Sequence, residues 1–121
     1  MLSPLAGRGQ APVYLAVGAT DMRKSIDGLC AIVQYSFSLD PFSPSVFVFC
    51  NRERDKLKIL FWENNGFWLY YRRLEKGRFQ WPKTSEPGPM IIDGRQLQWL
   101  LDGLALEQSR AHAPLQFRCA A

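Results

Sequence analysis

The side chains in this sequence that could do chemistry are mostly cations set among aromatic residues between positions 52 and 83. This segment holds nine of the 15 Lys and Arg residues but only four of the 11 Asp and Glu residues, so its net charge is +5 in a chain of net charge +4. Such a density of cations suits a polyanionic partner such as nucleic acid. The alternative is that these residues are solvated turn and edge positions that protect strands from aggregation.

The candidate nucleic-acid-binding residues lie at predicted turns and strand ends, where a long cationic side chain can reach a phosphate. Two of them, Arg23 and Lys24, lie in the first turn of a predicted helix, where free backbone N–H groups also attract anions. For these two, the alternative is simple exposure to solvent, with Arg23 paired to Asp27. The full candidate set is Arg52, Arg54, Lys56, Lys58, Arg72, Arg73, Arg78, Arg23 and Lys24.

Catalytic chemistry has no comparable pattern. The single histidine, His112, lies in a C-terminal segment without periodicity, and neither a Walker-type loop nor a GxGxxG loop occurs. Asp21, Asp27, Asp55 and Glu63 fall on different predicted elements, so no magnesium site is predicted. The three cysteines form no CxxC pair, which argues against structural zinc. We therefore expect no enzyme activity, no catalytic residue, no bound metal and no cofactor.

Length and composition indicate one globular domain. The chain has 121 residues, of which 47% are hydrophobic and 21% charged. No uncharged apolar stretch approaches the ~18 residues of a membrane span, and Met1–Gln10 lacks the apolar run of a signal peptide. We therefore expect a cytoplasmic protein with reduced thiols and no membrane partner.

A β-hairpin around Asn64-Asn65-Gly66 is the strongest structural prediction. Asn65-Gly66 favours a type I′ turn, which requires positive φ at both central residues. With these two as the turn, Asn64 pairs with Phe67 and Leu60 with Tyr71. One face then carries Leu60, Trp62, Leu69 and Tyr71, and the other carries Ile59, Phe61, Trp68 and Tyr70. Because both faces are apolar, we expect this strand pair near the middle of a sheet, covered on both sides.

The other predicted elements flank this hairpin. Strands are predicted at 13–17, 46–50 and 78–81. A helix is predicted to start at an N-cap on Thr20 and to end before Asp40-Pro41. A second helix follows Asp93, with Gln96 completing a capping box. Its apolar stripe recurs at helical spacing: Leu97, Leu100, Leu101 and Leu104.

The predicted element order is β-α-β-β-β-β-α, which indicates an α+β domain with a mostly antiparallel sheet and two amphipathic helices. The expected organisation is a flexible leader at 1–12, a single domain at 13–106 and a C-terminal tail at 107–121.

Several segments resemble the small accessory protein of the insertion-sequence 66 family of bacterial transposons. That protein is the product of the second open reading frame, often labelled TnpB, and differs from the RNA-guided nuclease of the same label. The resemblance runs from Val13 to Leu106 through VYLAVGATDMRKSIDGLCAIVQ, DPFSPSVFVF, NRERDKLKILFWENNGFWLYYRRLEKGRFQWP and LQWLLDGL. Its most specific parts are residues 20–24, 54–56 and 72–82.

This resemblance implies a role in DNA transposition beside a separate DDE transposase and a second element-encoded accessory protein. It implies no catalytic residues. Two mechanisms stay open: a DNA-binding module that grips phosphates through the basic residues, and a protein–protein adaptor without direct DNA contact. An adaptor would show an exposed aromatic patch, for example Trp62, Trp68 or Trp81. A nuclease, the weakest possibility, would need carboxylates that converge in the fold.

Overall fold

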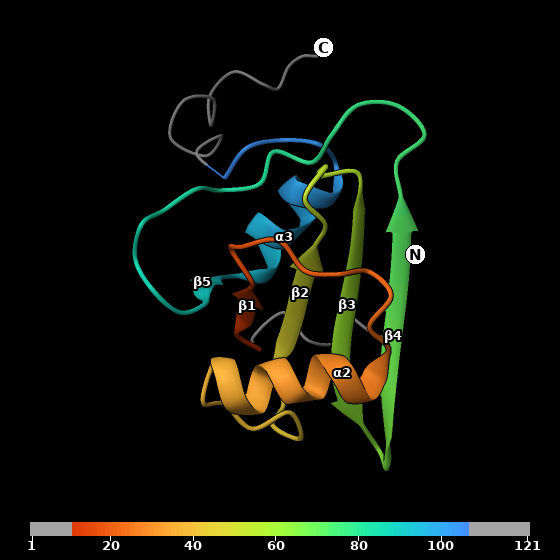
Figure 1. Ribbon diagram of the computed structural model, residues 1–121, viewed down its shortest axis with the longest axis vertical. Helices are drawn as coiled ribbons and strands as arrows, with labels where there is room; N and C mark the ends of the chain where they lie inside the picture. Colours follow the sequence, from red (N-terminus) through yellow and green to blue (C-terminus); the bar gives the residue numbers. More distant parts are fainter. Residues whose placement is uncertain (1–10, 107–121) are drawn as a thin grey trace.

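Five strands form one sheet in the computed structural model, which describes residues 11–106 (Figure 1). They are β1 (Val13–Leu15), β2 (Val46–Cys50), β3 (Lys56–Glu63), β4 (Gly66–Arg73) and β5 (Met90–Ile92), in the spatial order β4-β3-β2-β1-β5. Only β1 and β2 are parallel, because a helical crossover joins them, and every other neighbouring pair is antiparallel. The predicted α+β class with a mostly antiparallel sheet is confirmed.

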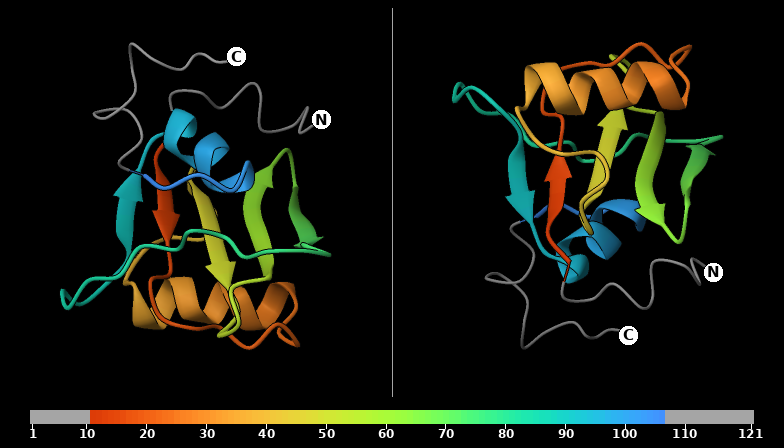
Figure 2. Two further views of the ribbon diagram at one scale, coloured as in Figure 1. Left: turned by 90° about the horizontal axis from the view of Figure 1, so that it is seen from above. Right: turned by 90° about the horizontal axis from the view of Figure 1, so that it is seen from below.

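The helices lie on opposite faces of this sheet (Figure 2). The α-helix α2 (Ile26–Ala31) continues into a π-helical turn, η1 (Ile32–Ser36), and α3 (Gly94–Leu101) covers the other face. Each face has its own core, with Leu29 and Val33 on the α2 side and Leu97 and Leu100 on the α3 side. All five residues of β2 are buried, which explains why its sequence is continuously apolar rather than alternating.

The first helix starts later than predicted. Thr20 is buried, and its backbone N–H donates to the carbonyl of Cys50 at 2.8 Å, so the chain still follows the sheet at this point. The N-cap is Ser25, without a side-chain capping bond. The predicted cap on Thr20 is therefore wrong, and Arg23 and Lys24 precede the helix instead of occupying its first turn.

The hairpin is present, but its turn lies one residue earlier than predicted. Asn64 and Asn65 have φ of 47° and 75°, and Leu60 pairs with Leu69 instead of Tyr71. Asn is among the side chains that tolerate this left-handed conformation, so Gly66 is free to start β4. The partner of each residue is thus shifted by two positions from the predicted one. Since side chains alternate with a period of two, both predicted faces keep their members.

The predicted central position of the hairpin is wrong for β4, which forms one edge of the sheet. Trp68 and Tyr71 are consequently 44% and 53% exposed. The strand predicted at 78–81 is absent, because Phe79 and Trp81 are buried in the α3-side core instead of extending the sheet beyond β4. The fifth strand, β5, was not predicted and pairs with β1 at the opposite edge.

The start of α3 agrees with prediction. Asp93 accepts a hydrogen bond from the Gln96 backbone, and the Gln96 side chain accepts one from the Asp93 backbone, which completes the capping box. Leu104 lies beyond the last helical residue, Leu101. No described helix has the length and apolar character needed to span a membrane. The predicted tail and most of the predicted leader lie outside the described residues.

Candidate nucleic-acid interface

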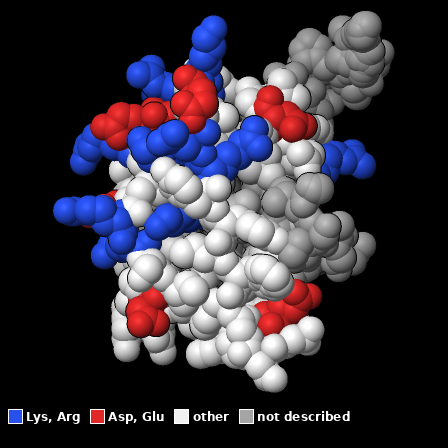
Figure 3. Space-filling view, turned by 90° about the vertical axis from the view of Figure 1, so that its right-hand side faces the viewer, with Lys and Arg blue, Asp and Glu red and all other residues white. Residues whose placement is uncertain are grey.

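Basic side chains gather at the end of the β3–β4 hairpin that lies opposite its turn, in the upper half of Figure 3. This end comprises the 51–55 loop, the start of β3, the end of β4 and the segment that follows it. The strand register sets Lys56 directly opposite Arg73. Three carboxylates, Glu53, Asp55 and Glu75, are interspersed with the cations in sequence.

The 51–55 loop is organised by Asn51, a buried residue that sequence reasoning missed. Its side-chain oxygen accepts hydrogen bonds from the backbone N–H groups of Asp55 (3.1 Å) and Lys56 (3.0 Å). Its amide nitrogen donates to the Asp55 carboxylate (2.7 Å) and to Glu53 (3.3 Å). The bond from Asn51 lowers the pKa of Asp55 below its usual value. An Asn at a strand end before a charged loop was the available signal, because Asn side chains often bond the backbone a few residues on.

Arg54 is held by this loop and contributes to the fold. It has a positive φ of 63°, and its guanidinium donates to the carbonyls of Asn51 (3.2 Å) and Val17 (3.3 Å). The guanidinium carbon lies 5.9 Å from the centre of the Trp81 ring. The backbone carbonyl of Arg54 also accepts a hydrogen bond from the Phe79 N–H at 2.7 Å. It therefore links the loop to the end of β1 and to the 79–81 segment.

Lys58 has a similar role on the α2 side of the sheet. Its ammonium donates to the carbonyls of Met22 and Lys24, both at 2.8 Å, and lies 5.8 Å from the centre of the Tyr71 ring. These bonds hold the 22–24 segment against the hairpin. Two of the nine candidate residues, Arg54 and Lys58, thus have donors engaged within the protein.

Three further candidates form ion pairs, of which two are exposed and one, Lys56 with Asp55, is partly buried. Arg23 contacts both carboxylate oxygens of Asp21, with a shortest distance of 2.8 Å, so Asp21 rather than Asp27 is its partner. Hydrogen bonds from Arg23 lower the pKa of Asp21 to about 2. Arg73 pairs with Glu75 at 3.0 Å and Lys56 with Asp55 at 3.5 Å. Ion pairs that water can reach are weak because solvent screens them, so a phosphate can replace the carboxylate.

The remaining four candidates are exposed, and no hydrogen bond or ion pair within the described part of the chain engages their side chains. They are Lys24, Arg52, Arg72 and Arg78. These residues can contact a ligand without breaking an existing interaction. They are the part of the candidate set best suited to binding.

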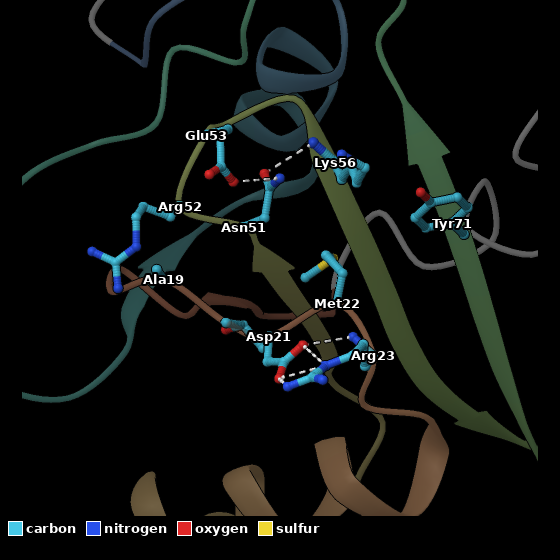
Figure 4. Close-up of a pocket in the computed structure, with 10 residues that line it drawn as sticks. Ala19, Asp21, Met22, Arg23, Asn51, Arg52, Glu53, Lys56 and Tyr71 are labelled. Atoms are coloured by element: carbon cyan, nitrogen blue, oxygen red, sulfur yellow. Dashed lines mark hydrogen bonds and ion pairs between the residues drawn. The ribbon is translucent and has the colours of Figure 1, made fainter.

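An open hollow of about 620 Å³ lies between the 19–23 segment on one side and the 51–55 loop with the start of β3 on the other (Figure 4). Its lining includes cations from both sides, among them Arg23 and Arg52, and the carboxylates of Asp21 and Glu53. Because its lining carries charges of both signs, this hollow is not a dedicated anion pocket.

Reactive groups are scarce in the described chain. Residues 11–106 contain no cluster of three His, Cys, Asp or Glu side chains that could hold a metal ion. Burial raises the pKa of the Cys30 and Cys50 thiols, which are both free, so they stay protonated at neutral pH.

Comparison with known proteins places this small α+β protein in a family. The family described as "IS66 Orf2 like protein" matches residues 11–111. The uncharacterized protein y4hO of Sinorhizobium fredii (strain NBRC 101917 / NGR234) is 38% identical over 92 residues, which cover 76% of this chain and 79% of y4hO. The uncharacterized protein y4jC of the same strain is 28% identical over 92 residues, covering 76% and 78%. No solved structure matches the chain.

The chain belongs to the IS66 Orf2-like family. This membership associates it with the transposition of insertion sequences.

Proposed function

We propose that this protein is a non-catalytic accessory factor for transposition that acts with a separate DDE transposase by binding DNA. The supporting observation is a set of exposed cations without side-chain partners in the described chain. Arg52, Arg72 and Arg78 lie at the end of the hairpin opposite its turn, and Lys24 lies in the segment before α2. In this mechanism they contact phosphates, while Arg23, Lys56 and Arg73 exchange a carboxylate for a phosphate. Arg54 and Lys58 keep the loop and the 22–24 segment in position.

Contacts to phosphates fix orientation on a duplex without reading its sequence. Binding of this kind is strongly salt-dependent, because each neutralised phosphate releases counterions. A preference for transposon ends would therefore require additional contacts to base edges or recognition of DNA shape.

Fluorescence anisotropy with transposon-end and random duplexes across a salt series tests this proposal. The wild-type affinity should fall steeply with salt. The triple variant Arg52→Ser/Arg72→Ser/Arg78→Ser should lower the slope of log K against log salt by roughly 0.9 for each phosphate that it no longer neutralises. Arg95→Ser, which removes an exposed cation from α3, is the matched control and should leave the slope unchanged. Absence of wild-type binding at low salt would refute direct DNA binding. A triple variant that binds like wild type would refute the assignment of the phosphate contacts to Arg52, Arg72 and Arg78.

An adaptor function is the second candidate, and exposed aromatic side chains favour it. Phe42 is 56% exposed, with its ring centre 4.9 Å from that of Trp62 and 5.3 Å from that of Phe67. Trp68 is also exposed, whereas Trp81 is only 7% exposed and is no part of such a surface. Titration of the purified transposase into wild type and Phe42→Ser by calorimetry tests this function. An adaptor function predicts a measurable heat of binding for wild type and a lower affinity for Phe42→Ser.

A further inference from the structure

The outer edge of β4 is a regular backbone edge that no other described strand covers. Its eight residues pair with β3 without interruption from Lys56–Arg73 to Glu63–Gly66, so the edge has no bulge. It contains no proline, and its only charges, Arg72 and Arg73, lie at its end. Native sheets normally protect an edge with a bulge, a proline, a central charge or a very short strand. The opposite edge, β5, is short at three residues.

The residues that present their backbone outward follow from the register. Glu63 and Gly66 flank a two-residue turn, and the Leu74 N–H donates to the carbonyl of Asp55. Hydrogen-bonded pairs alternate along an antiparallel ladder. The backbone N–H and C=O groups of the even-numbered residues of β4 therefore point toward β3. The N–H and C=O groups of Phe67, Leu69 and Tyr71 therefore point away from the sheet.

We propose that β4 pairs antiparallel with β4 of a second copy of this chain, so that the two sheets become one. An antiparallel pair of identical strands keeps equivalent faces together when the two-fold axis passes through Leu69 or through Tyr70. With the axis at Leu69, Trp68 faces Tyr70 of the second copy. With the axis at Tyr70, Trp68 faces Arg72 of the second copy, which is a favourable cation–π arrangement. In both registers, side chains that are half exposed in the single chain gain cross-strand neighbours.

The distribution of charge favours a second copy in this orientation. Parallel pairing would set Arg72 beside Arg72, and directly opposite like charges are destabilising. Antiparallel pairing offsets these two residues by four to six positions, or about 14–20 Å along the strands. This separation exceeds the screening length of about 8 Å at physiological salt. The pairing therefore brings equivalent faces together and keeps the arginines apart, and it does not depend on whether DNA is bound.

Two measurements on the full-length wild-type protein test the pairing together. Sedimentation velocity at increasing concentration should show a dimer. Amide hydrogen exchange by NMR should show that protection of Phe67, Leu69 and Tyr71 rises with the dimer fraction. The amides of Trp68 and Tyr70, which face β3, are the internal control and should be protected at every concentration.

The other outcomes all overturn the proposal. A monomer with fast exchange at the outward amides leaves the edge free. A monomer with protected outward amides assigns the edge to another segment of the same chain. A dimer with fast exchange at these amides uses a different interface.

A pair of variants at Tyr71 locates the contact on the backbone. Tyr71→Pro removes an outward N–H without removing a bond to β3, which is where sheets tolerate proline. Tyr71→Thr removes the same ring, including its contact with Lys58, but keeps the N–H. We expect a monomer for Tyr71→Pro and a dimer for Tyr71→Thr. A folded Tyr71→Pro that still dimerises would overturn the proposal, and the wild-type exchange experiment decides the question if this variant does not fold.

Discussion

Two groups of cations from the same stretch of sequence behave differently in the fold. Arg54 and Lys58 donate to backbone carbonyls from segments 36 or 37 positions away, at distances of 2.8–3.3 Å. Arg52 and Arg72 are exposed, without a hydrogen bond or ion pair to their side chains in the described chain. A high density of positive charge therefore combines residues that build the surface with residues that are available to a ligand.

The difference arises where the chain leaves the sheet after β1. Carbonyls in this segment no longer have a strand partner, so water or a side chain must supply the donor. Long cationic side chains from the neighbouring loop and from β3 supply the donors: Arg54 to Val17, and Lys58 to Met22 and Lys24. Removing a held cation should therefore reduce stability, whereas removing an exposed one should reduce binding.

The largest expected effect is on Arg54. Arg54→Ala removes both hydrogen bonds and the contact with Trp81, and we expect the free energy of unfolding to fall by about 2–3 kcal/mol. Arg54→Gly separates the contribution of the side chain from the cost of the backbone conformation, because glycine adopts the positive φ of 63° at no steric cost. The Gly variant should be the more stable of the two in urea unfolding at equal m-value. Two variants as stable as wild type would show that Arg54 is not a structural residue.

Lys58 should give the next largest effect. Lys58→Met keeps an apolar side chain of similar length but leaves two carbonyls without their donor, so we expect a loss of about 1–3 kcal/mol. Lys56→Met is the control on the same strand and face, since Lys56 makes only one ion pair at 3.5 Å in the described chain. The control should stay within about 0.5 kcal/mol of wild type. Equal losses of unfolding free energy in Lys58→Met and Lys56→Met, measured by urea unfolding, would show that Lys58 is no more structural than Lys56.

The exposed cations should have smaller effects on stability. Arg52→Ser should leave the free energy of unfolding within about 0.5 kcal/mol of wild type, because nothing in the described chain engages this side chain. The same variant should weaken binding to duplex DNA at low salt, whereas Arg95→Ser, which removes an exposed cation from α3, should bind as wild type does. Equal affinities of Arg52→Ser and Arg95→Ser in anisotropy would contradict the assignment of Arg52 to binding.

The exposed pair of Asp21 and Arg23 should have the smallest effect. The folded pKa of Asp21, about 2, lies below its ordinary value of 3.8. Any stabilisation from this carboxylate is therefore present above about pH 4 and is lost as the pH falls toward 2. An NMR titration of the Asp21 carboxyl should show a midpoint near 2, and Arg23→Gln should raise it toward the ordinary value. An unchanged midpoint in the variant would assign the shift to another group.

The predictions from sequence succeeded where neighbouring residues decide the structure. The capping box of α3 depends on residues three positions apart, and the two faces of the hairpin depend on alternation within each strand. The turn was misplaced by one residue because both Asn64-Asn65 and Asn65-Gly66 can adopt the required positive φ. The cap on Thr20 was wrong because a distant partner, the carbonyl of Cys50, takes its N–H.

The sequence by itself determined the α+β class, the hairpin with its two apolar faces, and the basic character of residues 52–83. These features follow from composition and from periodicities that span a few residues. Only the tertiary structure decided that β4 is an edge strand, that Phe79 and Trp81 fill the core, and that Arg54 and Lys58 are held while Arg52 and Arg72 are exposed. Each of these outcomes depends on which segments meet in space, and such contacts join residues that local patterns do not relate.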